Sequence, residues 1–272
     1  MKAGCNRGRV WHARWIAVFR DFNPCRAKLA AWHDQGVQAT QTPRRAPRAA
    51  ALFDFSGTLF RLEEDDSWFD GMAGDDQQVD GHLQAELMRR LTAPTGRSVE
   101  MGPAEYHAWV NRDLAPHLHR EAYLHVLRES GVADHHAESL YQRVITPASW
   151  TPYPDTVASL KGLTEQGVRT AVVSNIAFDV RPAFAAVGAD RYVDQFVLSF
   201  EVGAVKPDPK IFTAALERLG VAAGDAVMVG DSEEADGGAR QVGCDFILVD
   251  PLPTSQRRDG LLTALREYGF EL

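Results

Sequence analysis

Residues 49–58 read Ala-Ala-Ala-Leu-Phe-Asp-Phe-Ser-Gly-Thr, an apolar run that carries one acid and ends in a turn sequence. A short apolar run bounded by turn residues is typical of a strand buried on both faces of a parallel sheet. Similar runs recur further along the chain, at residues 170–174, 196–199, 226–230 and 246–250. Residues 49–55 therefore begin a series of buried parallel strands.

Amphipathic stretches separate these runs and predict helices. The expected helices cover residues 155–166, 178–187, 209–219, 233–242 and 259–268. Asp155 is expected to cap the first of them. A glycine directly follows the predicted C-terminal end of each of the first four helices: Gly167, Gly188, Gly220 and Gly243. Strands that alternate with helices form βαβ units, so the sequence predicts an α/β fold with a doubly wound (Rossmann-like) parallel sheet of about five strands.

Residues 60–150 interrupt this alternation. They show helical periodicity and no convincing strand, and the expected helices cover residues 77–91, 103–114, 117–129 and 134–144. We interpret the insertion as an all-helical cap domain over the active site. The predicted domains are a basic leader (1–48), an α/β core (49–59 and 151–272) and the cap (60–150).

The charge of the chain is unevenly distributed. Residues 1–48 hold ten Lys/Arg and two acids, a balance of +8. Since the formal net charge of the whole chain is −8, the remaining residues carry −16. A basic arm fits nucleic-acid binding or a transit peptide. We expect an unstructured leader instead, because residues 41–48 have the composition of a linker. The acidic remainder argues against nucleic acid as a partner of the domain itself.

Neither a membrane segment nor a cysteine framework is indicated. No apolar run approaches the roughly 18 residues that span a bilayer. The three cysteines, Cys5, Cys25 and Cys244, are widely spaced and form no CxxC pair. That pattern predicts neither disulfides nor a zinc site, and fits a reducing, cytoplasmic location.

Polar residues follow several predicted strands where each strand ends. Asp54, Ser174 and Asp231 each lie at or just beyond the end of an apolar run. Open α/β sheets bind ligands at the carboxyl ends of their strands. We therefore expect these side chains to meet, although they are far apart in the sequence.

Four segments in this order resemble the signature of the haloacid dehalogenase superfamily, most of whose members are magnesium-dependent phosphatases. They are residues 53–58, Ser174-Asn175, Lys206-Pro207, and Gly230-Asp231-Ser232 followed by Asp236. The resemblance covers residues 49–251 and also implies a helical cap after the first strand.

The resemblance implies a nucleophile and a metal site. Asp54 would attack phosphorus and form an aspartyl phosphate, which divides one difficult displacement into two easier ones. Mg²⁺ would be held by the carboxylates of Asp54 and Asp231 and by the backbone carbonyl of Ser56. Asp236 would orient the metal shell without ligating directly.

The remaining motif residues are implied to bind the phosphate. Ser174 would supply a hydroxyl, and Asn175 with the amides that follow would add donors at a helix start. Lys206 would neutralise Asp54 and the phosphate. Thr58 would hold Asp54 through a hydroxyl hydrogen bond.

Ser56 departs from the family pattern, Asp-x-Asp-x-Thr, which places a second Asp there. In the family that Asp protonates the leaving alcohol and then activates water, help that typically supplies about 10²–10⁴-fold in rate. Serine cannot do this at neutral pH. Three explanations stay open: a slow phosphatase, substrates with good leaving groups such as acyl phosphates, or a substitute acid from the cap. The candidates for such an acid are Glu63, Glu64, Asp65, Asp66 and His82.

Two rival functions are weighed against a phosphatase. One is a 2-haloacid dehalogenase, which also lacks the second Asp but needs no metal; the intact Gly230-Asp231-Ser232 argues against it. Phosphonatases, which are related enzymes, also replace the second Asp but need a lysine in the cap. No Lys lies between residues 29 and 160, which argues against a phosphonatase. The other rival is a weakly active fold used as a binding or regulatory protein. We expect a Mg²⁺-dependent hydrolase of a small phosphorylated metabolite, with its oligomeric state open.

Overall fold

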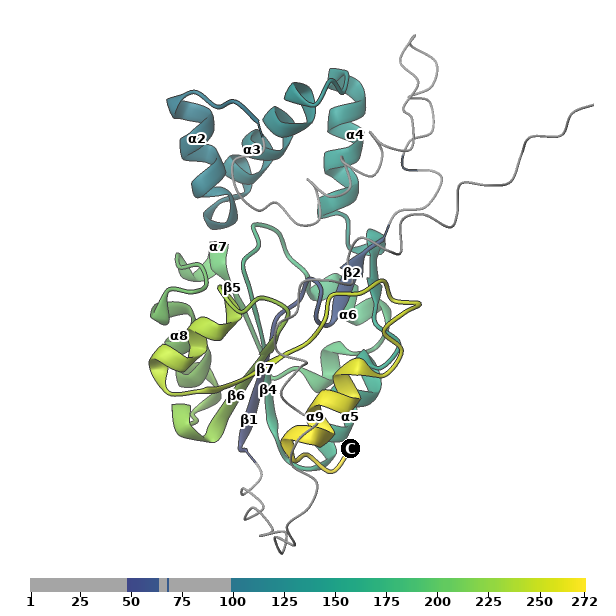
Figure 1. Ribbon diagram of the computed structural model, residues 1–272, viewed down its shortest axis with the longest axis vertical. Coiled ribbons are helices and arrows are strands. Elements are labelled where there is room, and N and C mark those ends of the chain that lie inside the picture. Colours follow the sequence, from purple (N-terminus) through teal and green to yellow (C-terminus); the bar gives the residue numbers. More distant parts are fainter. Residues whose placement is uncertain (1–47, 64–67, 69–98) are drawn as a thin grey trace, which may run out of the picture. The chain divides into compact units, whose positions relative to one another are not determined.

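A five-stranded parallel sheet forms the centre of the molecule, with strands in the order β5-β4-β1-β6-β7 (Figure 1). The computed structural model describes residues 48–63, 68 and 99–272. The strands are β1 (Ala50–Phe53), β4 (Arg169–Ser174), β5 (Gln195–Leu198), β6 (Ala226–Gly230) and β7 (Asp245–Leu248). Each coincides within a few residues with a predicted apolar run, so the predicted fold class is confirmed.

Helices cover both faces of this sheet, because successive side chains of a strand point to opposite faces. Ala51 and Phe53 of β1 join one apolar cluster with α5 (Thr156–Glu165), α6 (Arg181–Ala186) and α9 (Gly260–Tyr268). Ala50 and Leu52 join a second cluster with α8 (Pro209–Leu219) and the 3₁₀ helix η8 (Asp236–Val242). Two buried faces explain why the strands read as continuous apolar runs.

The bounds of most helices agree with the bounds predicted from the sequence. The short helices that complete the core are α7 (Ser199–Val202), η6 (Asp190–Tyr192) and η7 (Ala223–Asp225). The predicted glycine caps are confirmed by left-handed backbone angles at Gly167, Gly188, Gly220 and Gly243. Two predicted helices are shorter than expected, since α6 starts only at Arg181 and residues 233–242 yield only η8.

Asp155 caps a different helix from the one predicted. It precedes α5, but its side chain makes no capping hydrogen bond there. Asp155 Oδ2 instead accepts hydrogen bonds from Leu261 N (2.8 Å) and Leu262 N (3.1 Å), two amides in the first turn of α9. Because the two helices pack against each other, a tertiary contact replaces the local cap.

The inserted segment supplies helices with clusters of their own. They are α2 (Pro103–Val110), η4 (Arg112–Leu114), α3 (Pro116–Glu129), α4 (Asp134–Ile145) and η5 (Pro147–Ser149). Their apolar side chains form clusters distinct from the two that cover the sheet. The expectation of no strand in residues 60–150 is wrong: β2 (Phe60–Leu62) pairs antiparallel with β3 (Trp150–Pro152). Strands of three residues are too short to show an alternating pattern.

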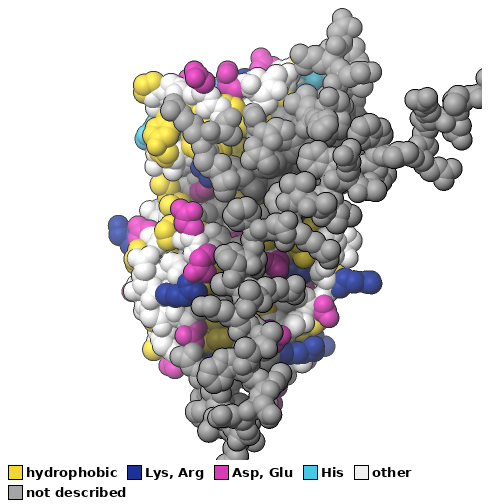
Figure 2. Space-filling view, in the orientation of Figure 1, with side chains coloured by type: hydrophobic (Ala, Val, Ile, Leu, Met, Phe, Trp, Pro, Cys, Tyr) yellow, Lys and Arg dark blue, Asp and Glu magenta, His cyan; other side chains and the backbone are white. Residues whose placement is uncertain are grey.

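Other expectations lie outside the described residues. These are the structure of the leader, a helix at residues 77–91, and the side chains of Glu64, Asp65, Asp66 and His82. Within the described residues, no helix is both long and apolar enough to cross a membrane. Acidic and basic side chains are interspersed over the described part of the face shown in Figure 2.

Candidate active site

The carboxyl edge of the sheet gathers the polar residues that follow its strands. β1 lies between β4 and β6, so Asp54, which follows β1, has the ends of both neighbours beside it. Asp54 N donates to Val229 O of β6 at 2.9 Å. Ser174 is the last residue of β4, and Asp231 directly follows β6. The chain turns from one half of the sheet to the other at this place, where α/β folds bind ligands.

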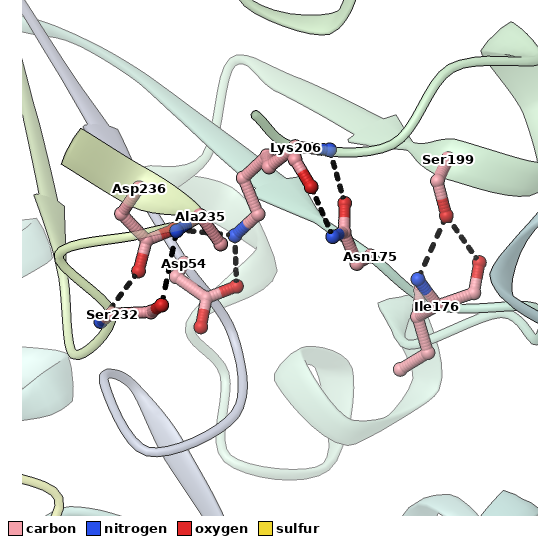
Figure 3. Close-up of polar contacts among 8 residues, drawn as sticks. All are labelled: Asp54, Asn175, Ile176, Ser199, Lys206, Ser232, Ala235 and Asp236. Atoms are coloured by element: carbon pink, nitrogen blue, oxygen red, sulfur yellow. Dashed lines mark hydrogen bonds and ion pairs between the residues drawn. The ribbon is translucent and has the colours of Figure 1, made fainter. Parts of the chain in front are cut away.

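Lys206 links two of the carboxylates (Figure 3). Its Nζ donates to Asp54 Oδ1 and to Asp236 Oδ1, both at 2.6 Å. The Lys206 side chain is 3% exposed, and those of Asp54 and Asp236 are 10% and 1% exposed. Burial lowers the pKa of Lys206, but the charges of Asp236 and Asp54 outweigh it and raise that pKa above its ordinary value. The lysine is therefore a fixed cation beside the proposed nucleophile.

Asn175 holds the loop that carries this lysine. Its Oδ1 accepts from Lys206 N (2.6 Å) and its Nδ2 donates to Lys206 O (2.9 Å). The next amide, Ile176 N, donates to Ser199 Oγ at 2.8 Å. The predicted helix start after Asn175 is wrong, because the next helix, α6, begins only at Arg181. The Asn175 side chain and the Ile176 amide have partners within the protein, and phosphate binding by this segment stays a prediction. Asn175 positions Lys206.

Three carboxylates converge on the site. Asp54, Asp231 and Asp236 offer oxygen atoms that all lie within 4.8 Å of one another. Burial raises the pKa of Asp54, Lys206 opposes the shift, and Asp231 adds to it. Burial, with the charge of Asp236, also raises the pKa of Asp231. Burial raises the pKa of Asp236 to about 6 against the pull of Lys206. One lysine leaves this buried acidic cluster incompletely neutralised.

The turn after β1 brings Asp231 close to the backbone. Gly57 has φ +79°, and a Cβ there would lie 2.4 Å from Asp231 Oδ2. Both the left-handed conformation and the close approach require glycine. Thr58 is fully buried, and its Oγ1 has no hydrogen-bond partner in the structure. The predicted hydrogen bond from Thr58 to Asp54 is therefore absent.

A buried arginine, which the sequence reasoning missed, supports the same turn. Arg257 lies in the segment between β7 and α9 and is 4% exposed. Its guanidinium donates to Gly57 O (2.7 Å) and to Thr58 O, and stacks 3.2 Å from the centre of the Tyr153 ring. Nothing in the local sequence distinguishes Arg257 from Arg258 beside it, because the contact joins segments about 200 residues apart.

Glu63, one of the five candidates for a substitute acid, already has hydrogen-bond partners. Its two carboxylate oxygens accept hydrogen bonds from Thr254 N (2.6 Å) and Thr254 Oγ1 (2.7 Å). Glu63 therefore ties β2 to the segment that carries Arg257. Ser56 lies in the turn itself, in an isolated bridge with Phe60.

A hydrogen bond joins η4 of the inserted segment to this edge of the sheet, and the sequence analysis did not predict it. Ser199 Oγ, at the start of α7, donates to Asp113 O in η4 at 2.5 Å. The same oxygen accepts from Ile176 N, as Figure 3 shows. The contact spans 86 residues and involves a backbone carbonyl, so no sequence pattern marks it.

The donor set suits a hard divalent cation. Carboxylate oxygens are the ligands that Mg²⁺ prefers. A divalent cation would also offset the negative charge that Lys206 leaves uncompensated. Asp236 is the least suited of the three to ligate a metal, because Oδ1 accepts from Lys206 and Oδ2 from Ser232 N at 3.0 Å.

Comparisons with known proteins match the family that the sequence motifs resemble. Residues 49–243 match the family model described as hydrolase, haloacid dehalogenase-like hydrolase. The mouse (Mus musculus) protein named "Haloacid dehalogenase-like hydrolase domain-containing protein 3" is 33% identical over 147 residues, which cover 51% of this chain and 59% of that protein. The protein named "Ribulose-1,5-bisphosphate 5-phosphatase" of Halopiger xanaduensis is 37% identical over 129 residues, which cover 44% and 54% of the two chains. The chain thus spans just over half the length of these relatives.

A solved structure shares the fold. L-2-haloacid dehalogenase from Xanthobacter autotrophicus, with chloropropionic acid covalently bound, superposes with a TM-score of 0.56 at 20% sequence identity. The match covers 79% of this chain and 83% of the dehalogenase. At this identity the likeness concerns the fold alone.

Proposed function

This chain belongs to the haloacid dehalogenase-like hydrolase family, and on that premise we propose that it is a Mg²⁺-dependent phosphatase of a small phosphorylated metabolite. The observation that carries the proposal is the buried arrangement of Asp54 and Lys206 beside Asp231. It joins a carboxylate nucleophile, a fixed cation and a second metal-binding carboxylate at one sheet edge. Family membership makes the chain an enzyme, and the named phosphatase relative supports phosphate as the group removed.

Asp54 is the nucleophile of this proposal. Its carboxylate attacks phosphorus, the bond to the leaving oxygen breaks, and an aspartyl phosphate forms. Lys206 holds Asp54 in place and faces the phosphate with positive charge. Ser174, at the end of the neighbouring strand, supplies a hydroxyl to the phosphate oxygens. The roles of Asn175 and Thr58 are structural, at the lysine loop and in the turn.

Asp54, Asp231 and the backbone carbonyl of Ser56 would hold the metal ion. Mg²⁺ supplies partial neutralisation of the charge on the transferring phosphoryl group. Asp236 keeps Lys206 and the Ser232 amide in position.

The substrate is a small phosphorylated compound, as the phosphatase relative implies, and we place the enzyme in the cytoplasm. Carbon–halogen hydrolysis is not favoured. It needs no metal, whereas this site concentrates three carboxylates, two of them buried, that a cation would stabilise. The dehalogenase neighbour shares the fold only.

Phosphate release tests the proposal. The protein is assayed with a panel of phosphorylated metabolites that includes acyl phosphates, with Mg²⁺ and with EDTA. We expect turnover that requires Mg²⁺ and disappears in Asp54→Asn, which keeps the shape of the side chain and removes its charge. Asp225→Asn is the matched control, because Asp225 is exposed beyond the opposite end of β6. Release of phosphate by Asp54→Asn at the rate of the unaltered protein, or no release from any compound, would overturn the proposal.

A further inference from the structure

The turn after β1 is closed by hydrogen bonds to its backbone carbonyl groups. Phe55 O accepts from Leu59 N (3.0 Å) and from Phe60 N (2.9 Å). Phe60 O accepts from Gly57 N (2.8 Å), and Leu59 O accepts from Tyr153 N (3.0 Å). These bonds fix the two ends of the turn directly after the proposed nucleophile.

Arg257 holds the two carbonyl groups in the middle of the turn. Its Nη1 donates to Gly57 O at 2.7 Å, and its Nη2 donates to Thr58 O. Nη1 also donates to Asp250 O at 3.1 Å, and the guanidinium lies 3.2 Å from the centre of the Tyr153 ring. The planar fork of a guanidinium fits two acceptors side by side, whereas the ammonium of a lysine is a point charge. Arg257 is therefore suited to hold both carbonyl groups at once.

The carbonyl group of Ser56 differs from its neighbours. Within the part of the chain that the structure describes, no group donates a hydrogen bond to Ser56 O. The carbonyl groups on either side of it, those of Phe55 and Gly57, are both bonded. Hard divalent cations take oxygen ligands, so the one oxygen that the turn leaves without a donor suits the proposed metal ion.

Gly57 connects this oxygen to both Arg257 and the acidic cluster. The Ser56 carbonyl and the Gly57 amide belong to one planar peptide group, so the orientation of one fixes that of the other. Gly57 O is bound to Arg257, and a Cβ on Gly57 would lie 2.4 Å from Asp231 Oδ2. The arginine and Asp231 thus contact the same residue, which directly follows Ser56.

We propose that Arg257 is a positioning residue for the metal ion, because it keeps the Ser56 carbonyl oriented toward the cation that Asp54 and Asp231 would bind. This role rests on the proposed Mg²⁺-dependent function. Charge alone would act in the opposite direction, since a guanidinium beside the acidic cluster repels a second cation. Positioning and charge therefore predict opposite changes of Mg²⁺ affinity when the arginine is removed.

Calorimetric titration of the apo protein with Mg²⁺ alone tests this role without reference to activity. Arg257→Met removes both the charge and the hydrogen bonds, and it should raise the Kd for Mg²⁺ about 10-fold. This is the lower end of the usual cost of removing a group that orients a metal ligand. Arg257→Lys keeps the charge but cannot hold both carbonyl groups in the same way, so it should raise the Kd as well.

Arg48→Met is the matched control for a general loss of stability. The Arg48 side chain is 10% exposed, and its Nε donates to Tyr268 Oη at 2.8 Å. Arg48 lies just before β1 begins, at the opposite end of that strand from Asp54. Its removal should lower the free energy of unfolding and leave the Kd for Mg²⁺ unchanged. An equal loss of affinity in Arg48→Met would show a general effect of destabilisation and would overturn the role of Arg257.

Failure of the metal site and failure of the arginine's role are distinguishable. If the unaltered protein binds no Mg²⁺, the proposed Mg²⁺-dependent function and the role of Arg257 both fall. If the unaltered protein binds Mg²⁺, equal binding by Arg257→Lys or tighter binding by Arg257→Met overturns the role of Arg257 alone. Circular dichroism checks the fold of each variant, and Arg257→Lys decides the question where Arg257→Met does not fold.

Discussion

Lys206 makes two buried carboxylates compatible with a stable fold. Its Nζ lies 2.6 Å from both Asp54 Oδ1 and Asp236 Oδ1, and all three side chains are shielded from water. Removing one partner of a buried ion pair leaves an uncompensated charge, which costs far more than the pair itself contributes. The lysine therefore contributes to stability, in addition to the catalytic role proposed for it.

We predict that Lys206→Met in EDTA lowers the free energy of unfolding by about 3–5 kcal/mol, the usual cost of breaking a buried pair. Urea denaturation followed by circular dichroism measures it. Lys210→Met is the control, because Lys210 is exposed on the first turn of α8. Equal stability of the two variants would show that Lys206 does not compensate the carboxylates.

Individual side chains show where sequence reasoning reaches its limit. The positions of Asp54, Ser174 and Asp231 at strand ends follow from the apolar runs before them, because parallel strands share a carboxyl edge. The hydrogen bonding of Asn175 and Thr58 cannot be inferred from the sequence in the same way. Asn175 bonds to Lys206, 31 residues away, and the hydroxyl of Thr58 is buried without a partner. Such contacts depend on the packing of distant loops.

Among the elements, the segment between β7 and α9 holds the turn that follows β1 through hydrogen bonds. Arg257 donates to Gly57 O and Thr58 O, and Thr254 binds both oxygens of Glu63. The turn after β1 and the strand β2 are thus anchored to one loop. The position of Asp54 depends on a segment with no motif of its own.

Arg257→Met should destabilise the protein by about 1.5–3 kcal/mol, the worth of a hydrogen bond to a charged group. It should also lower kcat, because the turn beside Asp54 loses its support. Phosphate release and urea denaturation test this together, with Arg258→Met as the exposed control. Unchanged turnover in Arg257→Met would limit the arginine to a structural role.

The elements differ in how far the sequence predicted them. β6 and α8 have the predicted bounds, because a long apolar run or a strong helical period decides them locally. The antiparallel pairing of β2 with β3 was missed, since each strand has three residues and 88 positions separate the end of β2 from the start of β3. The cap of α9 by Asp155 was missed because it spans 106 residues.

At the scale of the whole molecule, metal binding and folding should be coupled. The acidic cluster joins residues that follow β1 and β6 with η8, so it exists only in the folded protein. An ion that binds the folded state alone stabilises it by mass action. The cluster therefore connects global stability to the function.

Mg²⁺ should raise the free energy of unfolding by about 2.7 kcal/mol at a concentration 100 times its Kd. Denaturation of the apo protein at increasing Mg²⁺ measures this without reference to activity. Asp231→Asn should lose most of the increase, and Asp225→Asn should keep it. No stabilisation of the unaltered protein by Mg²⁺ would contradict a metal site at these carboxylates.

The central claim is a covalent phosphoryl group on Asp54, and rapid acid quenching tests it most directly. The protein is mixed with acetyl phosphate and Mg²⁺, quenched within the first turnover, digested and mapped by mass spectrometry. We predict one added phosphoryl group on the peptide that contains Asp54, and none in Asp54→Asn. Phosphate release without an adduct on that peptide, or an adduct that persists in Asp54→Asn, would contradict this account.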